Sequence, residues 1–278
     1  MDTYIGFDSA WTDNPRAPGA ICAVSLEDGR AVRWHAPELV SFDKALDFIR
    51  RVRAPSGVTL IALDQPTIVA NRTGMRPVEK VAASLVSWLG GGVQPSNTGR
   101  KGMFCHSAPV WRFLAKLGAT EDPEVARTAV SGLFVTEVFP ALALASLHTD
   151  FFGRLSAPRY NPARKRTFLE ADWTRVATVA AGEASQFNCE ELSKWCSHAA
   201  SLQKPAKADQ DRLDAALCTL IALSWRCRPR QESIMIGDLS SGYMIAPASL
   251  NVRRRLVDAA RRYTVPVDGL VRATPGAC

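Results

Sequence analysis

The chain has 278 residues, of which 47% are hydrophobic and 22% are charged, so it can bury a large core and is not expected to be disordered. No basic region followed by an apolar stretch opens the chain, and no segment reaches about 18 uninterrupted apolar residues, so we expect a cytoplasmic protein without a membrane span. Seven cysteines without a C-x-x-C pair and four scattered histidines argue against a disulfide framework and a structural zinc site.

The first part of the chain shows a regular order of apolar elements. Four strands are predicted, at residues 4–7, 20–26, 31–34 and 58–63. A turn at residues 27–30 joins the second strand to the third as a hairpin. A helix begins after Ser41, its expected N-cap, and precedes the fourth strand. The order is therefore β-β-β-α-β.

Acidic residues stand where these apolar elements end. Asp8 ends the first strand, Asp64 ends the fourth, and Glu137 lies in a further apolar run at residues 134–140. A charge at the edge of an apolar core is costly unless a cation or a metal ion compensates for it. An acid at the end of the first and the fourth strand of this unit predicts an RNase H-like core. We expect an α/β protein with a mixed five-stranded sheet, flanking helices and helical insertions.

A long helix at residues 207–226 carries two more acids. Asp211 and Asp214 lie near its start, and beyond Asp214 almost every residue is apolar. Such a helix is expected to be buried against the sheet with its acidic turns facing the strand ends. The alternative interpretation is that both acids interact with the helix N-terminal dipole.

The rest of the chain is predicted to surround this core within one domain, residues 1–278. Helical insertions are expected at about 65–130 and 141–203, the second with a basic loop at 159–166. A basic extension is expected at about 226–278, where nine arginines stand against four acidic residues. A basic end of this kind suits a polyanionic partner.

Four basic residues are candidate nucleic-acid contacts. Arg254 and Arg261 lie on a short amphipathic helix of the basic extension, and Arg100 and Lys101 lie in a glycine-rich loop. The alternatives are a solvated helix face and a mobile surface loop. The loop lacks the G-x-x-x-x-G-K-[ST] order, so a P-loop is not expected.

Five short phrases look like the marks of the domain-of-unknown-function family numbered 429. They are Ile5-Gly6-Phe7-Asp8-Ser9-Ala10, Ala62-Leu63-Asp64-Gln65-Pro66, Glu137-Val138-Phe139-Pro140-Ala141, Asp211-Arg212-Leu213-Asp214-Ala215-Ala216 and Gly242-Tyr243-Met244-Ile245-Ala246-Pro247. The resemblance implies a predicted nuclease of RNase H-like fold whose site resembles that of the RuvC-type resolvases. Asp8, Asp64, Asp211 and Asp214 match the acid positions of that site. Asp64 stands where the resolvases have the longer Glu, and Glu137 has no direct counterpart.

These residues together predict a metal-dependent nuclease. Two divalent ions about 3.5 to 4 Å apart would serve hydrolysis of a phosphodiester, and carboxylate ligands favour Mg²⁺ or Mn²⁺. We expect Asp8 to bridge the ions, Asp64 and Asp214 to hold one each, and Asp211 or Glu137 to complete the shell or orient water. The type of nucleic acid stays open, and a resolvase-like role would favour a homodimer.

Two other classes of function stay open. One is a nucleic-acid-binding or assembly protein that keeps the fold but has little activity. The other is a phosphotransferase of the actin and sugar-kinase type, which shares the β-β-β-α-β core. It is disfavoured because Ser9-Ala10-Trp11 follows Asp8, where a glycine and a hydroxyl residue are expected, and because 278 residues leave little room for a duplicated domain.

Overall fold

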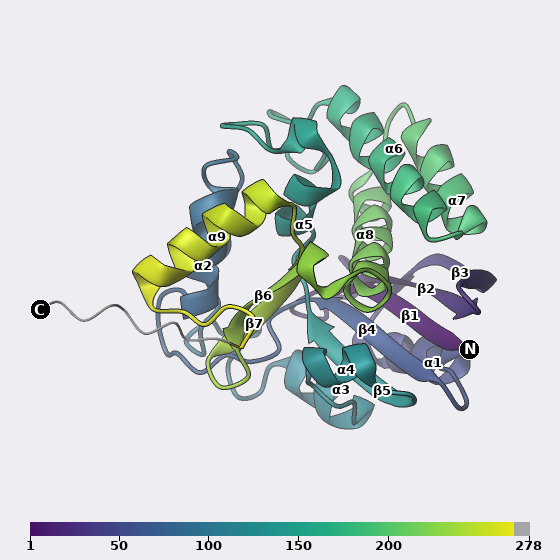
Figure 1. Cartoon of the computed structure of the whole chain (residues 1–278), viewed down its shortest axis with the longest axis horizontal. Helices are drawn as coiled ribbons and strands as arrows, with labels where there is room; N and C mark the ends of the chain where they lie inside the picture. The colour runs from purple at the N-terminus through teal and green to yellow at the C-terminus, as the bar shows by residue number, and fades with distance from the viewer. Residues whose placement is uncertain (270–278) are drawn as a thin grey trace, which may run out of the picture.

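The computed structural model describes residues 1–269 and has a mixed five-stranded sheet at its centre (Figure 1). Its strands are β1 (Asp2–Asp8), β2 (Gly19–Glu27), β3 (Arg30–Val40), β4 (Val58–Asp64) and β5 (Gly132–Glu137). They lie in the order β3-β2-β1-β4-β5. β1, β2 and β3 are antiparallel neighbours, whereas β4 and β5 extend the sheet in parallel with β1. The RNase H-like sheet predicted from the sequence is confirmed.

Local chemistry explains why the first elements form where they do. Asp28 and Gly29 both have positive φ, 49° and 74°, as a tight turn between β2 and β3 requires. The Ser41 side chain accepts a hydrogen bond from the backbone N–H of Lys44 and so caps α1 (Phe42–Val52) as predicted. β3 is longer than the predicted strand at residues 31–34, and its pairing with β2 is interrupted by register shifts.

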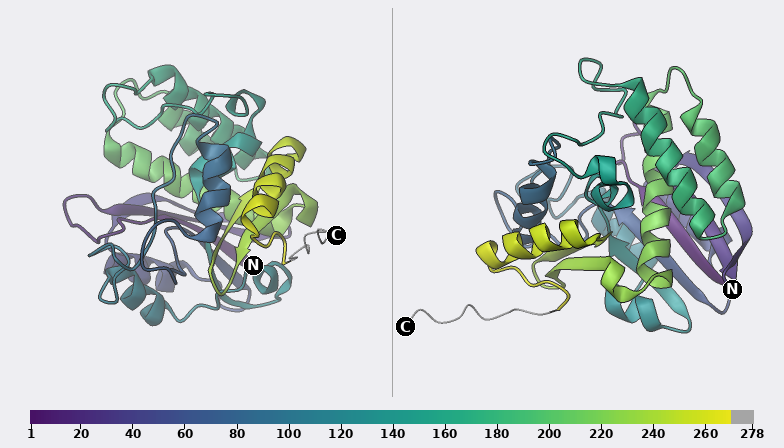
Figure 2. Two further views of the ribbon diagram at one scale, coloured as in Figure 1. Left: turned by 90° about the vertical axis from the view of Figure 1, so that its left-hand side faces the viewer. Right: turned by 45° about the horizontal axis from the view of Figure 1, so that its top comes forward.

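Helices cover both faces of the sheet. α1 and α3 (Pro109–Leu117) pack on one face. The other face is covered by α8 (Lys207–Cys227), outside which lie α6 (Glu170–Gln186) and α7 (Glu190–Ala200) (Figure 2). α8 crosses β1 so closely that a Cβ at Gly6 would clash with the backbone of Ala215. This contact positions the first turns of α8 beside the end of β1.

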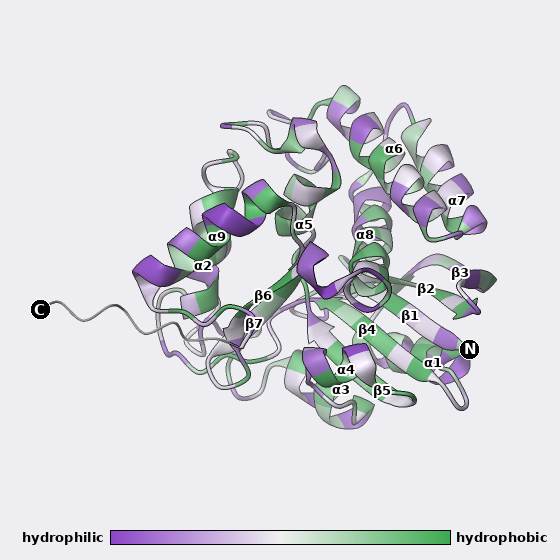
Figure 3. Cartoon of the chain, viewed as in Figure 1, coloured by the Kyte–Doolittle hydropathy of each residue, from purple (hydrophilic) through white to green (hydrophobic). Residues whose placement is uncertain are grey.

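A smaller lobe lies beside the sheet. β6 (Ser233–Asp238) and β7 (Gly242–Pro247) form a two-stranded sheet that packs with α2 (Pro77–Val86), α5 (Pro140–Leu147) and α9 (Leu250–Tyr263). Polar residues mark the outer side of α9, while β4 is mostly apolar (Figure 3). The expected insertions contribute α2, α3 and α4 (Pro123–Thr128), then α5, α6 and α7. The expected basic extension, as far as residue 269, supplies strands and a helix to this lobe.

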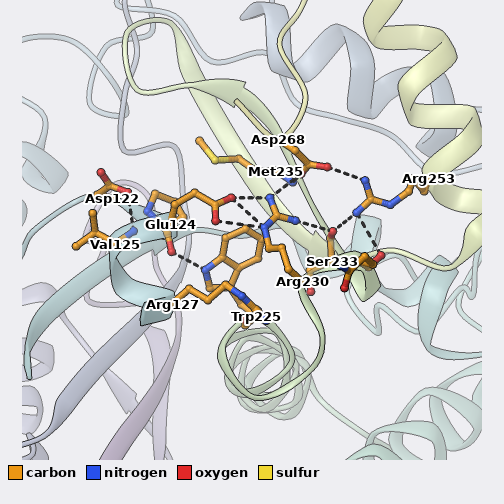
Figure 4. Close-up of polar contacts among 12 residues, drawn as sticks. Asp122, Glu124, Val125, Arg127, Trp225, Arg230, Ser233, Met235, Arg253 and Asp268 are labelled. Carbon is orange, nitrogen blue, oxygen red and sulfur yellow. Dashed lines mark hydrogen bonds and ion pairs between the residues drawn. The ribbon is translucent and has the colours of Figure 1, made fainter. Parts of the chain in front are cut away.

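An ion-pair network joins the lobe to α4 and the end of α8 (Figure 4). Arg230 binds Glu124 and Asp268, each at 2.6 Å, and stacks on the Trp225 ring at 4.4 Å from its centroid. Arg253 binds the other oxygen of Asp268 at 2.6 Å. Two arginines of the basic stretch are therefore used in holding the fold together. No helix among residues 1–269 is long and apolar enough to cross a membrane.

Candidate active site

Asp8 and Asp64 stand side by side at one edge of the sheet. They are direct partners in the parallel pairing of β1 and β4, so both side chains project from the carboxyl ends of neighbouring strands. Both residues are half-buried. Within residues 1–269 neither side chain accepts a hydrogen bond, although the indole N–H of Trp11 donates to the Asp64 backbone carbonyl at 3.2 Å. Two carboxylates thus meet without an internal donor between them.

α8 brings Asp214 and Asp211 to the same place. The Asp214 side chain is almost completely buried, and it accepts hydrogen bonds from the Tyr160 hydroxyl at 2.7 Å and from the Gln210 amide at 2.6 Å. Asp211 forms an ion pair with the half-exposed Lys207, one helical turn earlier. The two acids of α8 therefore have partners, whereas those of the strands have none.

The pKa values of these carboxylates show that they lie close enough to influence one another's ionisation. Burial raises the pKa of Asp8, and the charges of Asp214 and Asp64 raise it further. Burial and the charge of Asp214 likewise raise the pKa of Asp64. Burial raises the pKa of Asp214 to about 6. The ammonium of Lys207 opposes the shift in all three. Full ionisation of the cluster is therefore unfavourable unless a further cation is present.

The cluster suits a cation that needs few protein ligands. In the part of the chain that the structure describes, no three His, Cys, Asp or Glu side chains are grouped so as to hold a metal ion by themselves. Mg²⁺ uses one or two carboxylates together with water and substrate phosphates more often than a cage built only of protein ligands. The unpaired carboxylates of Asp8 and Asp64 meet that requirement.

Glu137 lies at the end of β5 but has a different set of partners. Both of its oxygens accept hydrogen bonds from the guanidinium of Arg76, at 2.9 and 2.5 Å, and the Thr67 N–H donates to it at 3.1 Å. Arg76 is fully buried and also binds Glu79 at 2.9 Å. The Glu137 backbone N–H donates to the Tyr243 hydroxyl of β7. Glu137 therefore belongs to the hydrogen-bond network that holds the lobe to the sheet, and its part in completing a metal shell or orienting water stays a prediction.

Three adjoining cavities are lined by the clustered acids. The lysine cavity, about 480 Å³, is lined by Asp8, Asp211 and Lys207, and the central cavity, about 200 Å³, by Asp64 and Glu137. The tyrosine cavity, about 530 Å³, is lined by Asp64, Asp214 and Tyr160. The residues shared between neighbouring cavities are Trp11 and Gln94 for the first two, and Asp64, Gly92, Phe139 and Arg164 for the last two. The carboxylates therefore line three cavities that adjoin one another through shared lining residues.

With this geometry in place, comparison with known proteins assigns a family. The family described as "Protein of unknown function (DUF429)" matches residues 6–235. The chain belongs to this family. No curated protein and no solved structure matches the chain significantly. The match with the DUF429 family begins within β1, includes the other four strands of the sheet, α8 and all the clustered acids, and ends within β6, before α9.

The basic residues chosen from the sequence lie at two places. Arg100 donates to the Pro95 carbonyl at 2.8 Å, and Lys101 beside it is exposed; Gln94 and Met103 of the same loop line the lysine cavity. That loop therefore borders the acids. Arg254 and Arg261 are exposed on α9, beyond the DUF429 match, and line none of the three cavities.

Several residues of the site were not anticipated from the sequence. Lys207 had a detectable signal, because it precedes Asp211 by four residues in the predicted helix. Arg159 and Arg164 line the tyrosine cavity and belong to the basic loop that the sequence marks. Tyr160 and Gln210 carry no such signal, because their contacts with Asp214 depend on the tertiary fold.

Proposed function

We propose that the chain is a divalent-metal-dependent nuclease that hydrolyses phosphodiester bonds of nucleic acid. The observation that supports this most strongly is the pair of adjacent carboxylates, Asp8 and Asp64, without a hydrogen-bond donor among residues 1–269. Burial and the charges of neighbouring carboxylates raise their pKa values, and a bound cation would stabilise the ionised forms.

This pair would hold the metal, and the residues around it would orient Asp214 and bind the substrate phosphates. Asp8 and Asp64 would hold Mg²⁺ or Mn²⁺ together with water and substrate oxygens, with Asp214 as their buried neighbour. Such ions supply an activated water and stabilise the leaving oxygen of an in-line displacement. Tyr160 and Gln210 fix the orientation of the Asp214 carboxylate through their hydrogen bonds. In the proposed enzyme, cationic side chains of the neighbouring cavities, such as Lys207 and Arg164, bind the phosphates that flank the reacting one.

A second candidate is a nucleic-acid-binding or assembly protein of the same fold. It is favoured by the ion pair between Lys207 and Asp211, since an internal ammonium partly neutralises the acids without metal. A phosphotransferase of the actin and sugar-kinase type is not supported, because residues 1–269 contain one five-stranded and one two-stranded sheet and so no duplicate of the core.

A cleavage screen tests the proposal. Labelled single-stranded, duplex and junction forms of DNA and RNA are incubated with Mg²⁺, Mn²⁺ or chelator. We expect metal-dependent cleavage by the wild type, loss of cleavage in Asp8→Asn, and full activity in Asp47→Asn, a surface acid that carries the same charge. Binding without cleavage under every condition would support the second candidate instead. Sedimentation of the same samples tests the expected homodimer.

A further inference from the structure

The tyrosine cavity has the size and lining of a site for one small organic group. Its volume, about 530 Å³, falls within the range of about 300 to 1,000 Å³ typical of small-molecule sites. Asp64 and Asp214 lie on its wall, so the cavity opens directly from the clustered acids. Apolar side chains line a large part of the remaining wall, namely Val86, Leu89, Phe139, Leu144, Leu155 and Ala157.

Charge distinguishes this cavity from a site for an apolar ligand. Arg159 and Arg164 are exposed on its wall, and within residues 1–269 the guanidinium groups of both are free of ion pairs and hydrogen bonds. Arg164 lines the central cavity as well, next to Asp64. An apolar surface between free guanidinium groups and the proposed metal-binding acids matches a base attached to a phosphorylated sugar.

Leu155 at this cavity is strained and exposed. Its φ is +62°, a conformation that a bulky L-residue rarely adopts, and 67% of its surface is exposed. Its N–H donates to the Trp88 carbonyl at 3.0 Å, and its Cα would lie 3.3 Å from a Cβ at Gly90. Backbone strain and an exposed leucine are both unfavourable in the free protein, and such features concentrate at ligand-binding sites.

We propose that the tyrosine cavity receives one unpaired nucleotide of the substrate strand, with its base against Phe139 and Leu155 and its phosphate toward Arg164 and the acids. The inference rests on the proposed nuclease function and names its substrate class. That class is single-stranded or locally unpaired nucleic acid, because a base that is stacked and paired within a duplex cannot enter a cavity sized for one small organic group.

Binding without cleavage tests the inference. Fluorescence anisotropy in chelator compares a labelled single strand, as DNA and as RNA, with a blunt duplex of the same sequence. We expect the single strand to bind at least about tenfold more tightly, as the stacking of one base on a protein side chain would give. The preferred sugar identifies the source of the nucleotide.

Two variants examine the cavity itself. Leu155→Gly removes the apolar contact, and Gly92→Leu adds a side chain where a Cβ meets no atom within 4 Å, on a residue that lines both the tyrosine and the central cavity. Each should weaken single-strand binding by about five- to tenfold and leave duplex binding unchanged. The matched controls are Leu239→Gly, an exposed leucine elsewhere, and Gly182→Leu, where a Cβ also meets no atom within 4 Å.

Thermal stability separates loss of the cavity from loss of the fold. Leu155→Gly should melt at the same temperature as the wild type or slightly higher, because glycine adopts positive φ without strain. Equal affinity for single strand and duplex, or unchanged binding in both cavity variants, would overturn the inference. If the single-strand preference depends on Leu155 but no cleavage occurs, the nuclease proposal fails and the cavity assignment stands. If the protein cleaves duplex and Leu155→Gly leaves that cleavage unchanged, the nuclease proposal stands and the cavity assignment fails.

Discussion

Replacing Asp64 with asparagine should make the metal-free protein more stable. Asp8 and Asp64 are partners on neighbouring strands, so we take their charges to be separated by roughly one strand spacing, about 5 Å. Two like charges at that distance repel each other by about 3 kcal/mol at an effective dielectric constant of 20. Solvent, shared protons and the ammonium of Lys207 reduce this value. We therefore expect the free energy of unfolding to rise by about 1–2 kcal/mol, or the Tm by about 2–6 °C, at pH 8.

The gain in stability of Asp64→Asn should depend on pH in a definite direction. Because the folded state raises the pKa values of Asp8, Asp64 and Asp214, it binds protons more tightly than the unfolded chain does. The repulsion is therefore present above these pKa values and lost as the pH falls through them; for Asp214 this occurs at about pH 6. The stability gained by Asp64→Asn should therefore shrink as the pH falls from 8 through the raised pKa of Asp64.

Differential scanning calorimetry in chelator measures the effect. Asp47→Asn is the control, because this exposed acid pairs with Arg50 on the surface and should change stability by less than about 0.5 kcal/mol. If Asp64→Asn melts below the wild type at pH 8 without metal, an internal partner stabilises the Asp64 charge and the inferred repulsion is wrong.

Three more substitutions examine other parts of the molecule. Lys207→Met should lower the Tm in chelator and raise the affinity for Mn²⁺ several-fold in a calorimetric titration, because the ammonium competes with metal for the acids; unchanged affinity would argue against competition. Arg76→Met leaves two buried carboxylates without a cation and should cost about 3–5 kcal/mol in urea unfolding, whereas a loss below about 1 kcal/mol would mean that they become protonated easily. The double variant Arg254→Gln and Arg261→Gln should flatten the dependence of nucleic-acid affinity on salt by up to about two units, and an unchanged slope would leave α9 as a solvated face.

The strand ends of the site could be predicted from the sequence because they depend on local pattern. Apolar runs ending in Asp8 and Asp64 define two strands, and the β-β-β-α-β order of the RNase H-like sheet makes those strands neighbours. Ser41 was recognisable as a helix cap for the same reason. Asp211 and Asp214 followed from the apolar helix that buries one side of the sheet.

The partners of the acids could not be predicted, because they come from distant parts of the chain. Nothing near Glu137 indicates that Arg76, 61 residues earlier, neutralises it. Tyr160 reaches Asp214 from a loop 54 residues away. The β6–β7 lobe was also missed, since its two short strands divide their buried side chains between α2 and α5 on one side and the core of the main sheet on the other. Leu155 is unremarkable in the sequence, and only its φ and its exposure mark it out.

Calorimetric titration with Mn²⁺ is the most direct test of whether the acids form a metal site. We predict that the wild type binds Mn²⁺, that Asp47→Asn binds it with the same affinity, and that Asp64→Asn binds it at least about tenfold more weakly, because an amide removes the charge and keeps the shape. Equal Mn²⁺ binding by the wild type and Asp64→Asn, or no binding by either, would show that the acids are structural and would contradict the proposed nuclease function.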